Sequence, residues 1–351
     1  MKLTLEEKLG QMFIIRMQGK EITDDLKTLI KDYHIGGVSL YSKNYDSYED
    51  MIDLINKLKE LNSKYNKTPL FISVDQEGGR VNRLPKDFEN TPSAKKISKD
   101  KKYVKEVGST IGEILNNLGI NMNFAPVLDI QRFNDNHAIG DRCFGYNKDS
   151  VTENGIVMMN SLKDKNIIPV VKHFPGHGLA KRDSHFFLPI VKKEIEQSED
   201  IEPFINAINL GADALMVSHL MIIKKDRFYP ASLSKKIITD YLKNELNYKG
   251  LIITDDLKMK AVNLLYGYKK SSLKAIEAGN DIILIGADYN TVITCIDNIK
   301  KKMNDSLKER IDESYDRIIK IKDKYKITDK TKKKFKIEKF NNRINKLKME
   351  I

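Results

Sequence analysis

The stretch IIPVVKHF, residues 167–174, is a short apolar run that ends in two ionisable side chains and an aromatic one. It lacks the strict alternation of apolar and polar positions, which is typical of a strand buried on both faces. The same pattern recurs in QMFIIRM (11–17), GGVSLYS (36–42), PLFISVD (69–75), INMNFAPVLDI (120–130), ADALMVSHL (212–220), GLIITDDL (250–257) and NDIILIGAD (280–288). These runs predict eight buried strands.

Amphipathic segments separate the apolar runs. The segment DSYEDMIDLINKLKELNSKY (46–65), for example, has apolar residues at positions 51, 52, 55, 58 and 61, which is the spacing of one helix face. Strands that alternate with helices predict a parallel sheet with right-handed crossovers. Eight such units predict an α/β fold, a closed (β/α)8 barrel of the TIM type. An open, doubly wound sheet is the alternative.

The chain of 351 residues is long enough for about two domains, but one α/β barrel also reaches ~250 residues or more. No linker rich in Pro, Gly or Ser interrupts residues 1–300, so we expect one domain. After the last strand, SLKERIDESYDRIIKIKDKY (306–325) has helical spacing and predicts a C-terminal helical extension. We therefore expect a barrel with terminal helices over residues 1–326 and a basic tail over 327–351.

Most of the net charge of +12 comes from the C-terminal end of the chain. Residues 300–351 hold 19 Lys and Arg against 9 Asp and Glu, so the remainder is close to neutral. No aromatic RNA-binding signature or zinc-finger spacing accompanies this basic end. We interpret it as a solvated terminus and expect no nucleic-acid partner, although binding to nucleic acid or to an anionic surface is the alternative.

The sequence also bears on the compartment. Its two cysteines, Cys143 and Cys295, are far apart, which disfavours a disulfide framework and agrees with a reducing compartment. No window approaches the ~18 unbroken apolar residues of a membrane span, and the N-terminus lacks the apolar core of a secretory signal. We expect a cytoplasmic protein, whose oligomeric state the sequence leaves open.

Ionisable side chains cluster where the predicted strands end. Asp75 follows the third strand, the Lys172–His173 pair ends the fifth, His219 follows the sixth, and Asp255 follows the seventh. In a (β/α)8 barrel the active site lies at the C-terminal ends of the strands. An aspartate after a strand can also cap the next helix, but capping does not explain a Lys-His pair inside an apolar run.

The segment KHFPGHGLAKRDSH (172–185) holds three of the six histidines. A metal site would use His173 and His177, but Pro175 and the adjacent glycines break any helix that would give this spacing a meaning. We therefore expect no metal and no cofactor. The pair of Asp183 and His185 fits proton transfer better, because a carboxylate on one ring nitrogen leaves the other as acid or base.

Five ordered motifs resemble glycoside hydrolase family 3, in particular its bacterial β-N-acetylglucosaminidases of the peptidoglycan-recycling type. They are VDQEGGRVNRL (74–84), IGDRCFG (139–145), KHFPGHGLAKRDSH (172–185), IITDDLKM (252–259) and AIEAGNDIILIG (275–286), and the resemblance covers roughly residues 1–326. It implies a retaining exo-glycosidase that hydrolyses terminal β-linked N-acetylglucosamine from peptidoglycan-derived or other glycans.

The resemblance also implies residue roles. It makes Asp255 the nucleophile, His185 the acid/base and Asp183 the partner of His185. The implied substrate-binding residues are Asp75, Arg83, Arg142, Lys172 and His173, and from its position we add His219 as a residue that lines the site. Cys143 stands where the branch usually has serine, next to Arg142. A phosphorylase on the same scaffold, or a β-glucosidase or arabinosidase of the same family, remains the alternative.

Overall fold

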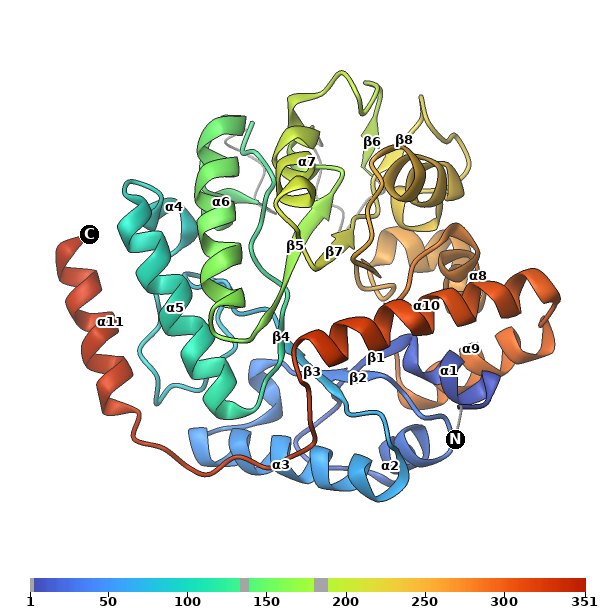
Figure 1. The fold of residues 1–351 in the computed structure, drawn as a ribbon, viewed down its shortest axis with the longest axis horizontal. Helices are drawn as coiled ribbons and strands as arrows, with labels where there is room; N and C mark the ends of the chain where they lie inside the picture. Colours follow the sequence, from blue (N-terminus) through green and yellow to red (C-terminus); the bar gives the residue numbers. More distant parts are fainter. Residues whose placement is uncertain (1–2, 133–138, 180–188) are drawn as a thin grey trace.

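The computed structural model describes residues 3–132, 139–179 and 189–351, which form a barrel of parallel strands surrounded by helices (Figure 1). The barrel strands follow one another in the order β10-β1-β2-β3-β4-β5-β7-β9. A parallel bridge between Ile253 and Ile282 joins the last strand of this series to the first. The ring is therefore closed, and the open sheet is excluded.

All eight predicted strands are confirmed. Their bounds are β1 (Phe13–Arg16), β2 (Gly37–Ser39), β3 (Phe71–Val74), β4 (Met122–Asn123), β5 (Ile168–Phe174), β7 (Ala214–Val217), β9 (Leu251–Thr254) and β10 (Ile283–Ile285). Nearly every strand residue is buried, because one face lines the barrel interior and the other lies under the helices. Two short strands, β6 (Ile190–Val191) and β8 (Met221–Ile222), pair outside the barrel.

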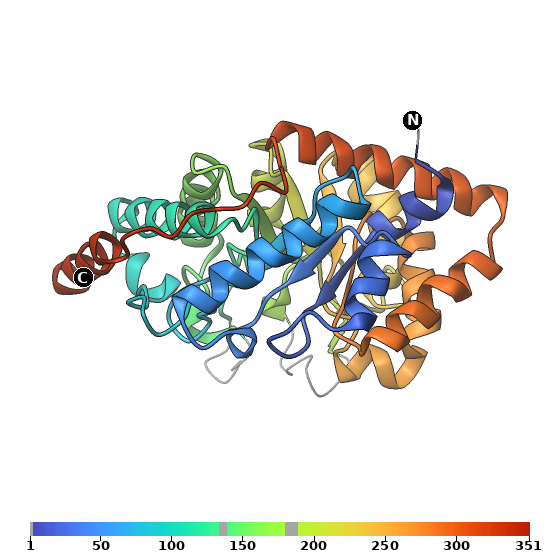
Figure 2. The same cartoon turned by 90° about the horizontal axis from the view of Figure 1, so that it is seen from below.

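The helices lie outside the barrel (Figure 2). Their bounds are α1 (Leu5–Gln11), α2 (Asp24–Lys31), α3 (Tyr48–Tyr65), α4 (Ala94–Ile97), α5 (Lys101–Leu118), α6 (Lys148–Lys163), α7 (Glu202–Asn209), α8 (Lys260–Ala278), α9 (Tyr289–Lys301), α10 (Asp305–Lys324) and α11 (Glu338–Glu350). A π-helix, Lys236–Glu245, precedes β9. Local signals define their starts: Thr4 and Glu7 form the capping box of α1, and Ser47 caps α3. No described helix combines the length and the apolar character that crossing a membrane requires.

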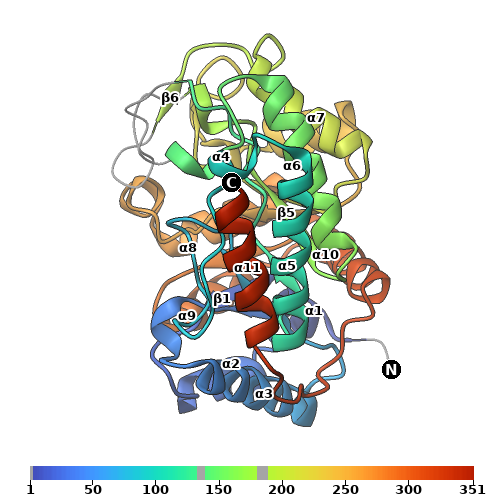
Figure 3. The same cartoon turned by 90° about the vertical axis from the view of Figure 1, so that its left-hand side faces the viewer.

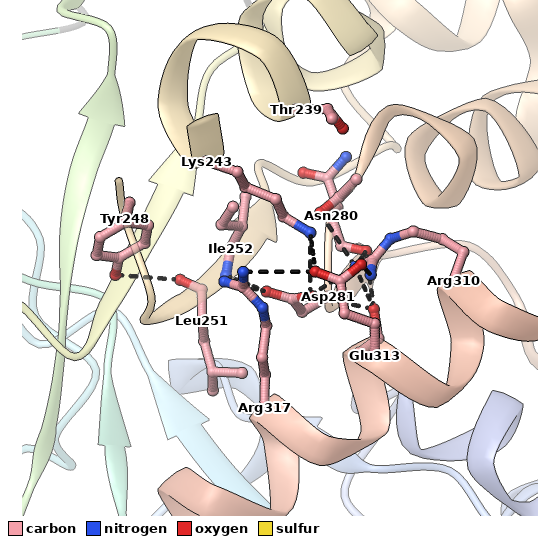
Figure 4. A network of polar contacts seen from close by, with 12 residues as sticks. Thr239, Lys243, Tyr248, Leu251, Ile252, Asn280, Asp281, Arg310, Glu313 and Arg317 are labelled. Atoms are coloured by element: carbon pink, nitrogen blue, oxygen red, sulfur yellow. Dashed lines mark hydrogen bonds and ion pairs between the residues drawn. The ribbon is translucent and has the colours of Figure 1, made fainter. Parts of the chain in front are cut away.

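A buried carboxylate fastens α10 to the barrel at the end where the strands begin (Figure 4). Asp281, just before β10, accepts the backbone N–H of Ile252 at 3.0 Å and a guanidinium N–H of Arg310 at 2.6 Å. Lys243 and Arg317 also lie within 4 Å of its oxygens. Because Asp281 is fully buried, these cations compensate a charge that water cannot reach.

The predicted basic tail contains α11, which packs against α5 (Figure 3). Its buried side chains are Phe340, Ile344 and Leu347. Its basic residues meet acids of the body, with Lys339 at 3.0 Å from Glu113 and Lys348 at 2.5 Å from Glu89. Part of the charge excess is thus used within the protein, while the boundary at residue 326 stays a prediction.

Candidate active site

Polar residues predicted at the strand ends meet at one end of the barrel, which we call the mouth. Nζ of Lys172 on β5 lies 2.8 Å from Oδ1 of Asp75, which follows β3. Asp255 follows β9, and its backbone N–H donates to the carbonyl of Val217, the last residue of β7. Enzymes with this fold carry their active sites at the C-terminal ends of the strands, and the mouth is that end.

A buried carboxylate that we did not predict, that of Glu77, links two predicted sugar-binding residues. Nε and Nη2 of Arg142 each lie 2.8 Å from one of its two oxygens, and Nζ of Lys172 lies 2.6 Å from Oε1. Burial by itself would raise the pKa of the Glu77 carboxyl, but the two cations hold it well below its ordinary value. Glu77 therefore holds Arg142 and Lys172 side by side.

A second unpredicted carboxylate, that of Asp129, orients His173. Nδ1 of His173 lies 2.6 Å from Oδ2 of Asp129, and the backbone N–H of His177 donates to Oδ1 at 2.6 Å. Burial opposes ionisation of Asp129, but the imidazole of His173 holds its pKa below the ordinary value. The contact fixes the orientation of the His173 ring and places a proton on Nδ1.

The two consecutive aspartates after β9 differ in their surroundings. Burial would raise the pKa of Asp255, but the nearby imidazoles of His173 and His219 help to hold it below the ordinary value. For Asp256, burial raises the pKa to about 6, and the charge of Asp255 adds to this shift. Oδ1 of Asp256 accepts the backbone N–H groups of Lys258 and Gly286, which ties β9 to β10. Asp255 is thus the better anion and Asp256 the structural one.

His219 is fully buried beside these aspartates. Its Nδ1 lies 2.6 Å from Oγ of Ser232, and its Nε2 lies 3.1 Å from the backbone carbonyl of Asp256. These contacts brace the chain after β9, and His219 also helps to lower the pKa of Asp255. That His219 lines the site remains a prediction.

Two arginines stack on one tyrosine at the mouth. The guanidinium carbon of Arg16 lies 3.6 Å from the ring centroid of Tyr41, and that of Arg83 lies 5.3 Å from it. Burial raises the pKa of Tyr41 above its ordinary value, and the charges of Asp75 and Asp256 add to this shift. We predicted Arg83 alone. The strand-end rule could have found the others, because Arg16 ends β1 and Tyr41 comes two residues after β2.

The predicted acid/base pair, Asp183 and His185, lies outside the described residues. The chain enters that segment from β5 through Pro175 and a short 3-10 turn, His177–Leu179, so it leaves from the mouth. Within the described ranges, no group of three or more His, Cys, Asp or Glu side chains is arranged to hold a metal ion. The described part of the site therefore offers paired carboxylates and cations.

Comparisons with known proteins give a consistent result. Residues 4–321 match the glycosyl hydrolase family 3 N terminal domain. A beta-hexosaminidase from Haemophilus influenzae is 32% identical over 300 residues, which are 83% of this chain and 84% of that protein. Among solved structures, a glycoside hydrolase family 3 beta-N-acetylglucosaminidase from Paenibacillus sp. str. FPU-7 superposes with a TM-score of 0.92 at 31% identity. That alignment covers 99% of this chain and 68% of the other.

A second structure, the beta-N-acetylglucosaminidase from Thermotoga maritima, gives a TM-score of 0.76 at 27% identity and covers 89% of this chain and 66% of the other. The family match spans the whole barrel and both motifs that supply the mouth's charges, around Asp75 and Asp255. On the strength of the closed barrel, the charged mouth and a match over nearly its full length, the chain belongs to glycosyl hydrolase family 3.

Proposed function

We propose that this protein is a retaining exo-glycosidase that hydrolyses terminal β-linked N-acetylglucosamine, or another N-acetylhexosamine, from the end of a glycan. The names of its relatives support the reaction and the sugar. The single observation that carries the proposal is the carboxylate of Asp255, which lies partly buried at the barrel mouth, where His173, His219 and Lys172 help to hold its pKa below the ordinary value. A retaining glycosidase uses an ionised carboxylate that attacks the anomeric carbon.

In the proposed mechanism, Asp255 attacks the anomeric carbon and forms a covalent glycosyl-enzyme while His185 donates a proton to the departing oxygen. His185 then takes a proton from the water that releases the sugar. Asp183 orients His185 and keeps its proton mobile. A histidine with an ordinary pKa near ~6.5 suits both halves of this cycle at neutral pH.

The polar side chains around Asp255 are proposed to hold the sugar. They are Asp75, Arg83, Arg142, Lys172, His173 and His219. The contacts of Lys172 support this role, because its ammonium group is held in place by ion pairs with both Asp75 and Glu77. Fixed donors and acceptors at a buried mouth suit the recognition of sugar hydroxyl and amide groups.

The finer assignment concerns the source of the glycan and the compartment. We propose peptidoglycan-derived fragments as substrates, because the sequence motifs resemble the peptidoglycan-recycling branch of the family. The proposed compartment is the cytoplasm, which fits the thiols of Cys143 and Cys295, since both are buried and unbridged. Appearance of the enzyme in an extracellular or periplasmic fraction of its native cells would contradict this compartment.

A trapped intermediate tests the nucleophile. Incubation with a fluorinated N-acetylglucosaminide analogue is expected to add one sugar to the protein, and peptide mapping should place that sugar on Asp255. D255N should remain folded and unlabelled, because its Oδ1 can still accept the N–H of Asp256. D256N is the matched control. A single oxygen of Asp256 accepts both backbone N–H groups, so the amide can preserve them and labelling at 255 should persist.

The products decide between hydrolysis and phosphorolysis. With a β-linked N-acetylglucosaminide as substrate, we expect free N-acetylglucosamine at the same rate with and without phosphate. Release of the sugar as its 1-phosphate in the presence of phosphate would overturn the hydrolase in favour of a phosphorylase. A sugar label on Asp256 in the wild-type protein would overturn the choice of nucleophile.

A further inference from the structure

A cavity of about 300 Å³ lies at the end of the barrel opposite the mouth. One wall is the segment between α10 and α11, residues 326–337, which we call the strap. The other wall consists of α3, the end of α5 and the residues that precede β4 and β5. In Figure 1 the strap runs past α3 on its way to α11. We call this cavity the strap pocket.

The described lining of the strap pocket is basic and contains no acidic side chain. Four lysines line it, together with polar and apolar residues. These lysines are Lys59, Lys326, Lys330 and Lys332. The lining also includes Thr328 and Thr331, whose hydroxyl groups can donate or accept a hydrogen bond.

Lys59 distinguishes this pocket from a group of surface lysines. Only 3% of this residue is exposed. Its ammonium group has no hydrogen bond or ion pair with any group in the described part of the chain, although Lys332 and Asp329 are close enough to influence it. A buried ammonium group normally has a partner, because the loss of hydration is costly. Burial, together with the charge of Lys332, lowers the pKa of Lys59 to about 8.

The surrounding groups are already engaged and do not serve as that partner. The carboxylate of Asp329 accepts the side-chain amide of Asn62 at 2.6 Å and the backbone N–H of Leu70 at 3.1 Å. Nζ of Lys332 donates to the side-chain oxygen of Asn116 at 3.1 Å. Lys59 therefore contributes positive charge that no neighbouring acid directly neutralises.

Gly119 leaves room for this charge to reach the cavity. It closes α5 with a φ of +85°, in the left-handed region. A Cβ built at this position would stand 2.8 Å from Nζ of Lys59. The absence of a side chain there keeps the ammonium group accessible to a ligand.

We propose that the strap pocket binds a phosphate group, either as free phosphate or carried on a molecule the size of a monosaccharide, with Lys59 as its buried anchor. A cavity of this volume stands at the lower end of the range for small-molecule sites, ~300–1,000 Å³. Lysine binds phosphate as a point charge, and several lysines without an acid suit a dianion. The bound anion would connect the strap to the barrel through Lys59 and Lys332.

Matched lysine variants test the site. Isothermal titration with inorganic phosphate, and separately with a hexose 6-phosphate, is expected to show binding to the wild-type protein. K59M retains the buried methylene chain but removes the charge, and should weaken binding at least about tenfold, as expected for the loss of one charge-assisted hydrogen bond. K57M is the control, because Lys57 is exposed on the same helix and does not line the pocket. It should bind like the wild type.

Two further results make the outcome decisive. K59R keeps the charge and should retain most of the affinity, which separates loss of charge from damage to the fold. If K59M does not fold, K332M provides the same test from the strap. The proposal would be overturned if the affinity for both probes were unchanged in K59M and K332M, or if neither probe bound to the wild type at millimolar concentration. Binding of the sugar phosphate alone would support its larger form.

Discussion

Replacing Glu77 by glutamine tests whether its buried carboxylate holds Arg142 and Lys172, the proposed sugar-binding cations, in place. The amide oxygen is expected to take the position of Oε1, where Arg142 at 2.8 Å and Lys172 at 2.6 Å both donate. The amide nitrogen then faces Nε of Arg142, which now donates to Oε2 at 2.8 Å. One charge-assisted hydrogen bond is lost, and a donor is left facing a donor.

The magnitude follows from these contacts. A hydrogen bond to a charged group contributes about 1.5–3 kcal/mol, and removal of one partner from a buried ion pair costs about 3–5 kcal/mol. Because two of the three contacts of Glu77 survive in E77Q, we expect the free energy of unfolding to fall by about 2–4 kcal/mol. The Michaelis constant should rise more than the turnover number falls, since Arg142 and Lys172 are proposed to bind the sugar.

Urea unfolding and steady-state kinetics measure both effects. E89Q is the matched control, because Glu89 pairs with Lys348 on the surface and such pairs contribute about 0–1 kcal/mol. The pH dependence adds a check of sign. The pKa of Glu77 is lower in the folded protein, so its stabilisation is present above the unfolded-state pKa of about 4.3 and is lost as the pH falls through the folded value. E77Q with the unfolding midpoint and the Michaelis constant of the wild type would refute this reasoning.

Three other variants probe separate parts of the molecule. D129N can keep its backbone contacts, but its side-chain amide offers a donor to Nδ1 of His173, so kcat/KM should fall on the order of tenfold or more without loss of fold. An unchanged kcat/KM would mean that the contact between Asp129 and His173 is unimportant for activity. Burial lowers the pKa of Lys322 to about 7, so above that pH the unfolded state binds more protons and the free energy of unfolding should rise from pH 7 towards about 10. K322M should abolish this rise in urea titrations, and the same pH dependence in K322M and the wild type would contradict the shift. D281N should reduce the free energy of unfolding by about 3–5 kcal/mol, because Arg310 loses its buried partner. The kcat/KM of the folded enzyme should stay unchanged, because this ion pair lies far from the mouth, and a change in kcat/KM without a loss of stability would contradict the prediction.

The strands and the end of the barrel that carries charge could be predicted from the sequence, because both depend on local patterns. A run such as IITDD contains the strand and the acids that follow it, and Asp255 lies where that pattern places it. Glu77 and Asp129 were missed as site residues because their importance depends on partners 65 and 44 positions away. No local pattern contains such pairings, so only the folded barrel shows which carboxylate faces which cation.

The C-terminal segment carries two sequence signals, many lysines and an apolar helix face, and the first drew attention away from the second. Its lysines favoured a solvated end, yet Phe340, Ile344 and Leu347 follow the i, i+4, i+7 spacing of an apolar helix face and are buried. Some of the lysines that raise the net charge are paired with acids of α5 and of the loop between β3 and α4. Net charge alone therefore says little about whether a basic segment is free to bind a partner.

The consecutive aspartates of the TDD motif show how one site can keep its proposed nucleophile, Asp255, ionised. Burial pushes the pKa of both carboxyls upward, and each environment then decides the result. For Asp255, the nearby His173 and His219 help to offset the upward shift of the pKa. For Asp256, two backbone N–H groups lower the pKa, but the charge of Asp255 raises it further. As the pH falls towards 6, the proton therefore goes to Asp256 first, which removes the repulsion and leaves Asp255 anionic. Adjacent carboxyls with separated pKa values mark a division of roles, one chemical and one structural.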